Sequence, residues 1–242
     1  MISPEQLVTE YLDYYVLIST TGFHQEIYDF LIENGWEQDK IFNVGKVTSE
    51  LYQQQYFDRE IMKPCQNEIF VDGGCYDCST DSLFIKWCGG EYKKILAFEP
   101  DIKNYERCQK AAKNISDMEL FNKGLWSREE TLHFAGNADQ GSKIIDAQDE
   151  NVTTVPVAAI DEVVGNDKVT LIKMDVEGAE LEALKGASRT IIENHPRLAI
   201  SIYHKPEDIW EIPAYILSLS DEYRFYIRHY QLSKNETILY AV

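Results

Sequence analysis

Several short apolar runs in the chain are each followed by a polar side chain that can bind a ligand or move a proton. If these runs are parallel strands, their carboxyl ends meet at one edge of a sheet, where α/β proteins bind ligands. The polar residues would then lie together although they are far apart in the sequence. They are Asp72, Glu99, Asn122, Asp175 and the pair Tyr203-His204.

The first of these strand ends continues into a turn, Asp72-Gly73-Gly74. Glycine lets a backbone approach a ligand closely, but the third glycine of the dinucleotide fingerprint is missing here. A carboxylate beside the turn disfavours a pyrophosphate and favours a cation. Glu99 ends the next run, where an acid can accept hydrogen bonds from ribose hydroxyls. A nucleoside with a positive charge, such as S-adenosylmethionine, fits both features.

The elements that would hold these residues alternate between short apolar strands and helices from residue 68 onward. This alternation is typical of a doubly wound, mainly parallel sheet with helices on both faces. The last two strands are joined by a short loop, which predicts an antiparallel hairpin at the C-terminal end. We expect strands at 68–72, 94–99, 118–122, 169–175, 197–203, 224–230 and 237–242, helices at 80–88, 102–114, 179–194 and 206–219, and a hairpin and loop at 131–157.

The first 66 residues have a different character, and we expect a boundary between residues 1–66 and a core domain at 67–242. The Ser3-Pro4 pair is typical of a helix start, and apolar residues continue at helical spacing to about Ile18. Further helices are expected around residues 27–34 and over 49–62. We expect this acidic, tyrosine-rich helical extension to cap the acceptor site or to form a homodimer interface.

The charge balance of the chain disfavours some partners. Its 41 acidic and 23 basic residues give a net charge of −18, whereas nucleic acids and anionic lipid surfaces attract basic patches. No apolar run approaches the roughly 20 residues of a membrane-spanning helix, and the N-terminus lacks the features of a signal peptide. We therefore expect a cytoplasmic protein that binds neither nucleic acid nor a membrane.

The cysteines could form a site of their own. The chain has five of them, an odd number that does not favour a disulfide framework in a chain of this length. The Cys75-x-x-Cys78 spacing fits a metal site or a redox site. A structural zinc site needs four ligands, and no second Cys pair or nearby His pair supplies them. We therefore interpret Cys75 and Cys78 as small residues in a tight loop.

A series of segments in the second part of the chain carries a resemblance to a known family. They are Phe70 to Gly74, Phe98 to Asp101, Leu171 to Glu180, Ile202 to His204, and the C-terminal run from Arg228 to Tyr240. In order and spacing they resemble the FkbM family of methyltransferases. The resemblance covers about residues 68–242, and the block around Asp175 is its most specific part. One departure is that cysteines stand at positions 75 and 78, where the family commonly has small residues.

The resemblance implies a class I methyltransferase fold, a Rossmann-like α/β fold whose seven-stranded sheet has an antiparallel last strand. It implies S-adenosylmethionine as methyl donor and, as the usual acceptor, a hydroxyl group of a sugar, glycan or secondary metabolite. The residues carried over to the cofactor are Asp72, Gly73 and Gly74 for the methionine part, Glu99 for the ribose, Asn122 for the adenine, Tyr76 for the sulfonium, and Asp175.

Methyl transfer to an alcohol calls for a base, because a hydroxyl is a weak nucleophile until its proton is removed. Asp175 and His204 end strands that we expect to be neighbours. His204 is the first candidate for the base, since the pKa of histidine lies near neutrality, and Asp175 would orient it or take the proton itself. Asp175, Glu177 and His204 are also ligand types for a divalent cation. The sequence does not show that they converge, so we expect no metal.

Two other functions compete with this interpretation. A nicotinamide-dependent oxidoreductase is disfavoured by the missing third glycine and by the terminal hairpin. A cofactor-binding or scaffold protein that kept the fold and lost catalysis is disfavoured by the presence of Asp72, Glu99, Asp175 and His204. Methyl transfer to a hydroxylated acceptor would separate the enzyme from the scaffold.

Overall fold

The computed structural model of the protein describes residues 2–135, 152–231 and 235–242. The described chain divides into two compact units. The first contains the residues up to Gln55 together with Tyr230 and Gln231, and the second contains the others from Tyr56 onward. None of the described helices has the length and apolar character needed to cross a membrane.

The first unit is a small α/β structure with its own core. Its two short strands, β1 (Val16–Ile18) and β2 (Ile41–Asn43), pair in parallel. Leu31 and Trp36 are buried together with one isoleucine from each strand. Its helices are α1 (Pro4–Glu10), α2 (His24–Glu33), the 3₁₀ helix η1 (Gln38–Lys40) and α3 (Val44–Gln54).

Two expectations for this unit are wrong. The first helix starts at the expected Ser3 cap but ends at Glu10, and the chain continues to a strand that the helical spacing did not predict. The helix expected over 49–62 begins earlier, because the Asn43 side chain accepts a hydrogen bond from the third residue beyond it and caps the first turn. It also ends earlier, before Tyr56, whose φ of 69° is not helical. A role of this segment as cap or dimer interface stays a prediction.

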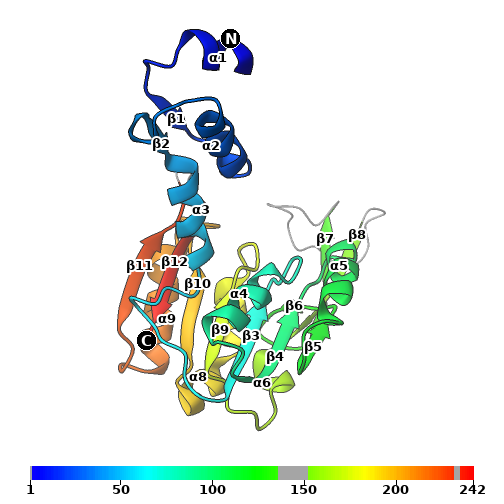
Figure 1. Ribbon diagram of the computed structural model, residues 1–242. Helices are drawn as coiled ribbons and strands as arrows, with labels where there is room; N and C mark the ends of the chain where they lie inside the picture. Colours follow the sequence, from blue (N-terminus) through cyan, green and yellow to red (C-terminus); the bar gives the residue numbers. More distant parts are fainter. Residues whose placement is uncertain (1, 136–151, 232–234) are drawn as a thin grey trace. The chain divides into compact units, whose positions relative to one another are not determined.

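The second unit is built on a seven-stranded sheet. The strand order is β11-β12-β10-β9-β3-β4-β5, and all strands run in parallel except β12, which is antiparallel to both of its neighbours (Figure 1). This confirms the expected class I methyltransferase fold with its C-terminal hairpin. The strands are β3 (Glu68–Gly73), β4 (Tyr92–Phe98), β5 (Met118–Phe121), β9 (Leu171–Met174), β10 (Arg197–Ser201), β11 (Phe225–His229) and β12 (Thr237–Ala241).

The helix expected over 179–194 is two helices. They meet at Gly186, where a Cβ atom would overlap the carbonyl oxygen of Trp126. Glycine is unfavourable inside a helix, and here it allows a close approach of another segment. The described helices of this unit are α4 (Ser79–Trp87), α5 (Ile102–Ala112), α6 (Ile160–Val163), α7 (Glu180–Lys185), α8 (Ser188–Asn194) and α9 (Asp208–Leu219).

Successive residues of the central strand β3 pack on opposite faces of the sheet. Ile69 and Val71 belong to the main hydrophobic core, together with buried residues of α6, α7, α8 and α9. Phe70, between them, stacks on Phe84 of α4 with ring centroids 4.4 Å apart. Helices therefore cover both faces, as the alternating pattern predicts.

A three-stranded sheet with the order β6-β8-β7 completes the unit. Its strands are β6 (Gly124–Leu125), β7 (Glu130–Ala135) and β8 (Val152–Ala158). The antiparallel pairing of β7 with β8 confirms the expected hairpin. The loop expected between its strands, including the acidic stretch 146–150, lies outside the described residues.

Candidate active site

The strand order of the large sheet changes direction at β3. The chain leaves β3 for β4 and β5 on one side, and later returns to β9 and β10 on the other side (Figure 1). In open α/β sheets ligands bind at the carboxyl ends of the strands beside such a change of direction. The site residues expected from the sequence lie in the last residues of β3 or shortly after β3, β4, β5, β9 or β10, so the fold places them at this end of the sheet.

The turn after β3 is packed too tightly for side chains. At Gly74, whose φ is 79°, a Cβ atom would overlap the carbonyl oxygen of Asp175 at the end of β9. At Gly73 it would lie 2.6 Å from Cδ1 of Leu125. The two glycines thus allow the turn to pack against β9. Their expected contact with a cofactor stays a prediction.

Asp72 is completely buried, and its partner is a lysine of the neighbouring strand β9. Its Oδ1 atom accepts a hydrogen bond from Nζ of Lys173 at 2.8 Å. The same ammonium donates to the carbonyl oxygens of Gly73 and Gly74 at 3.1 and 2.7 Å. Burial alone would lower the pKa of Lys173, but the carboxylates of Asp72 and Asp175 outweigh it and raise the pKa. Asp72 therefore stabilises the turn indirectly, because it favours the charged form of the lysine that donates to the turn carbonyls.

Glu99 is held in one orientation by two backbone amides. Its Oε2 atom accepts a hydrogen bond from the Tyr76 N–H at 3.0 Å, and its Oε1 atom accepts one from the Asp101 N–H at 2.8 Å. Burial raises the pKa of Glu99, although both amide contacts act in the opposite direction. A carboxylate has about four lone-pair positions, so this side chain can accept further hydrogen bonds from two neighbouring hydroxyls.

Asn122 and Tyr76 lie beside this acid but differ in what they contact. The Asn122 amide donates to the carbonyl oxygens of Glu99 and Pro100 at 2.9 and 3.1 Å, so it fixes the turn after β4. The Tyr76 ring is 58% exposed and is free to cover a ligand. The expected contacts with adenine and sulfonium stay predictions.

Asp175, directly after β9, is the centre of a second cluster. Its Oδ2 atom accepts a hydrogen bond from the Tyr56 hydroxyl at 2.8 Å, and its Oδ1 atom accepts one from the Tyr203 hydroxyl at 3.1 Å. Burial, and next the Asp175 carboxylate, raise the pKa of both tyrosines. Both hydroxyls therefore keep their protons and remain donors to Asp175.

The structure brings His204 to the same cluster. Its Nε2 atom lies 3.5 Å from Oδ1 of Asp175 and 3.4 Å from Oε2 of Glu177, and its Nδ1 atom lies 2.8 Å from Oε1 of Glu180. Burial alone would lower the pKa of His204, but contact with Glu180 and the charges of Asp175 and Glu177 raise it above its ordinary value. The three carboxylates therefore favour the protonated form of the imidazole.

One atom each from Asp175, Glu180 and His204 lies within 4.8 Å of the other two. Such oxygen and nitrogen atoms are ligands for divalent cations. The sequence suggested Glu177 in place of Glu180; Glu177 lies in the turn before α7, with a φ of 55°, and its Oε2 atom also contacts His204. The expectation of no metal stays a prediction.

The sequence did not identify three residues of this region. Lys173 is a charged residue inside the apolar run of β9, and this charge within a strand was the available signal. Glu180 occupies the first position of α7, where an acid is ordinary, but its Oε1 atom accepts the Val176 N–H at 2.9 Å and faces His204. Tyr56 had no signal, because its contact with Asp175 joins residues 119 positions apart.

Comparisons with known proteins agree with this geometry. The family model described as "Methyltransferase FkbM domain" matches residues 72–231. A search of curated proteins finds no match. Among solved structures, the chain is similar to a methyltransferase FkbM from Methylobacillus flagellatus KT, with 23% identity and a TM-score of 0.67 over 99% of this chain and 58% of that one. This chain therefore spans less than two thirds of that protein's length.

Two further structures have lower similarity. An Aeropyrum pernix fibrillarin with natively bound S-adenosyl-L-methionine has 11% identity and a TM-score of 0.48, over 81% of this chain and 74% of that one. An rRNA methylase from Streptococcus thermophilus has 14% identity and a TM-score of 0.46, over 82% and 93%. The family model matches well over half of the chain and favours a methyltransferase over an oxidoreductase. The chain belongs to the FkbM methyltransferase family.

Proposed function

We propose that this protein transfers the methyl group of S-adenosylmethionine to a hydroxyl group of a sugar, a glycan or a secondary metabolite. The observation that carries the proposal is the pair of clusters on either side of β3. Glu99 and the glycine turn lie towards β4, and Asp175 with His204 lies after β9 and β10. The first cluster suits a nucleoside, and the second suits an acceptor that must lose a proton.

The cofactor side rests on the geometry of Glu99. Its two oxygens are separately oriented by backbone amides and keep lone pairs that can accept the two ribose hydroxyls. The neighbouring Tyr76 ring is exposed and can cover a positively charged group. When bound, S-adenosylmethionine supplies a methyl group on a positively charged sulfur.

The acceptor side favours Asp175 as the group that takes the proton. The side chain of Asp175 is 24% exposed, whereas that of His204 is 7% exposed and both ring nitrogens are shielded from solvent. Asp175 is thus the first candidate for the base and His204 the second, which reverses the order expected from the sequence. His204 acts as a positioning residue that supplies positive charge behind Asp175.

Bound S-adenosylmethionine would supply the methyl group, with its sulfur as the leaving atom that keeps the bonding electron pair, and the acceptor oxygen would take that group. Asp175 would take the hydroxyl proton. The acceptor oxygen must lie about 3–3.5 Å from the methyl carbon for this displacement. The two tyrosine hydroxyls fix the Asp175 carboxylate and so set the direction from which the acceptor hydroxyl approaches it.

The proposal is tested first at the cofactor. Calorimetric titration of the protein with S-adenosylmethionine and S-adenosylhomocysteine should show micromolar binding of both, and NAD should not bind. The variant Glu99→Ala should lose most of this affinity. Glu119→Ala is the matched control, because Glu119 is an exposed acid on the neighbouring β5 that pairs with Lys94.

The outcomes separate the alternatives. If neither adenosyl compound binds to the folded protein, the proposal is wrong. If both bind but no hydroxylated acceptor in a sugar, glycan and metabolite screen is methylated, the scaffold interpretation is favoured. Transfer of labelled methyl groups to an acceptor hydroxyl, reduced in Asp175→Asn, supports the enzyme.

A further inference from the structure

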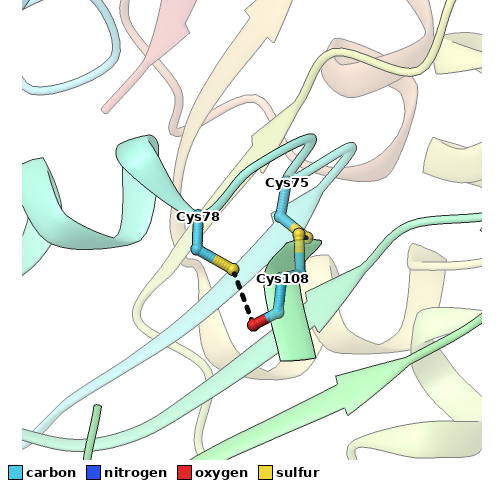
Figure 2. Close-up of side chains that lie close together, drawn as sticks. All are labelled: Cys75, Cys78 and Cys108. Atoms are coloured by element: carbon cyan, nitrogen blue, oxygen red, sulfur yellow. Dashed lines mark hydrogen bonds between the residues drawn. The ribbon is translucent and has the colours of Figure 1, made fainter. Parts of the chain in front are cut away.

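The Cys75-x-x-Cys78 pair acquires a third member in the fold. Cys75 and Cys78 lie in the loop between β3 and α4, and Cys108 reaches the same place from α5 (Figure 2). All three side chains are buried. One sulfur from each lies within 4.8 Å of the other two. The sequence directly beside the pair contains no third cysteine, and the fold supplies one, Cys108, from α5.

The spacing of the sulfurs is close to that of a metal site. Sγ of Cys75 lies 3.5 Å from Sγ of Cys108. A tetrahedral ion with metal–sulfur bonds of about 2.3 Å needs sulfurs about 3.8 Å apart. The ion would therefore fit between the three side chains with small rotations. Because the described cluster contains three sulfurs and no fourth, a four-cysteine iron–sulfur site is disfavoured.

The backbone holds the two loop cysteines in place without a metal. The N–H of Cys78 donates to the carbonyl oxygen of Cys75 at 2.8 Å and closes a turn. Cys78 itself has a left-handed backbone, with φ 63°, which few non-glycine residues adopt. On the other side, Sγ of Cys108 lies 3.3 Å from the carbonyl oxygen of Tyr76. The site is therefore largely formed before an ion arrives.

The electrostatics of the cluster differ among its three thiols. The side chains of Cys75 and then Cys78 can donate to Cys108, and they lower the pKa of that thiol well below its ordinary value. Their own pKa values are raised, for Cys75 chiefly by contact with Cys108 and then Cys78, and for Cys78 chiefly by contact with Cys108. A thiolate is the form of cysteine that binds a metal. An incoming ion would therefore bind as it displaces the protons of these thiols.

Asp81 is a second, independent sign of a missing partner. It is fully buried in α4, and neither of its carboxyl oxygens has a hydrogen-bond partner. Burial and then Asp72 raise the pKa of Asp81 well above its ordinary value, while Lys173 and the Cys78 side chain act in the opposite direction. Asp81 is thus a buried polar group, three residues after Cys78, that lacks a hydrogen-bond partner, and groups beside metal ligands commonly hydrogen-bond to them.

We propose that Cys75, Cys78 and Cys108 bind a thiophilic divalent cation of the zinc class. The three thiolates are its protein ligands, and Asp81 supports the sulfur of Cys78. Cation binding would fix the loop that carries Tyr76, whose N–H holds Glu99. The inference does not depend on the proposed methyl transfer, because binding of the cation can be measured by itself.

The test uses the full-length, reduced and chelator-treated protein, with Cd²⁺ as the probe. Titration should produce thiolate-to-metal charge-transfer absorbance that saturates at one equivalent. Binding should release protons near neutral pH, because thiols lose their protons when they bind a metal. Cys78→Ala and Cys108→Ala should bind at least about 100-fold more weakly. Cys88→Ala is the matched control, because this buried cysteine ends α4 outside the cluster.

A second measurement uses the unmodified chain, in case a cysteine variant does not fold. With Cd²⁺ bound, alkylation followed by peptide mapping should show protection of Cys75, Cys78 and Cys108, while Cys65 and Cys88 react as they do without the ion. Saturable absorbance with this protection pattern supports the site. Absence of charge-transfer absorbance in the folded, reduced protein, or equal losses in Cys88→Ala and Cys108→Ala, would overturn it.

Discussion

The ammonium group of Lys173 lies 2.8 Å from Oδ1 of Asp72, and both side chains are almost completely shielded from solvent. The pair joins two neighbouring strands of the sheet, β9 and β3, where Asp72 and Lys173 are register partners. Because the ammonium also donates to the carbonyl oxygens of Gly73 and Gly74, one lysine neutralises a buried acid and fixes the turn after β3.

Removal of this lysine should strongly destabilise the second unit. Lys173→Met leaves the Asp72 carboxyl buried without its cation, and breaking a buried pair in this way costs about 3–5 kcal/mol. The free energy of unfolding measured in urea would show the loss. The double variant Asp72→Leu/Lys173→Met removes both charges and should recover most of it.

Lys94→Met is the control for Lys173→Met. Lys94 contacts Glu119 and Asp167, each at 2.8 Å, but its side chain is 26% exposed. Loss of such a solvent-exposed pair costs at most about 1 kcal/mol. Equal losses of unfolding free energy in the two single variants would show that burial does not increase the contribution of the Asp72–Lys173 pair to stability.

Most strands of the sheet were predictable because they are short apolar runs followed by a polar residue. Asp72, Glu99, Asp175 and His204 were identified by their positions after these runs, and the parallel pairing of β9 with β10 places the last two together. The role of Lys173 was not predictable in the same way. The sequence does not indicate which face of the sheet a lysine within a strand will point to. Its partner, Asp72, lies on the neighbouring strand and is identified only in the fold.

Long-range contacts explain the other omissions. Tyr56 reaches Asp175 across 119 positions, and Cys108 reaches Cys75 across 33. The spacing of residues within a short stretch of sequence does not indicate such pairs. In the first unit, the helical spacing that continues from α1 to Ile18 competed with strand pairing, and β1 forms because a parallel partner, β2, is available in the fold. Tertiary pairing thus overrode a helical pattern.

The raised pKa of His204 predicts how stability depends on pH. The folded state binds the proton more tightly than the unfolded state, whose histidine has a pKa of about 6.5. The stabilisation is therefore fully present below that pH and is lost as pH rises through the higher folded-state pKa. Urea unfolding at a series of pH values should show this decline in the wild type and not in His204→Gln.

His195→Gln serves as the control for this experiment. His195 is an exposed residue whose Nε2 atom lies 3.7 Å from Glu222. Its replacement should leave the decline of stability above neutral pH in place. If the wild type and His204→Gln show parallel pH profiles, the carboxylates around His204 do not hold its proton as described.

The roles assigned to Asp175 and His204 can be separated by kinetics. If Asp175 takes the acceptor proton, Asp175→Asn should lower kcat by about 10²–10⁴-fold, as is typical for loss of a general base. S-adenosylmethionine affinity should change much less. His204→Gln should cause a smaller loss of kcat and should shift the pH profile of kcat. A larger loss in His204→Gln than in Asp175→Asn would return the base to His204.

The close packing of the glycine turn gives a prediction that needs no ligand. Gly74 and Gly89 both have a left-handed backbone, with φ of 79° and 67°, but a Cβ atom at Gly74 would overlap the Asp175 carbonyl, whereas one at Gly89 would meet nothing within 4 Å. Gly89→Ala should therefore cost only the backbone strain, about 1–2 kcal/mol. Gly74→Ala should cost about 1–3 kcal/mol more, because β9 must move away from the turn. Unfolding in urea measures both, and equal costs would mean that the turn can shift freely against β9.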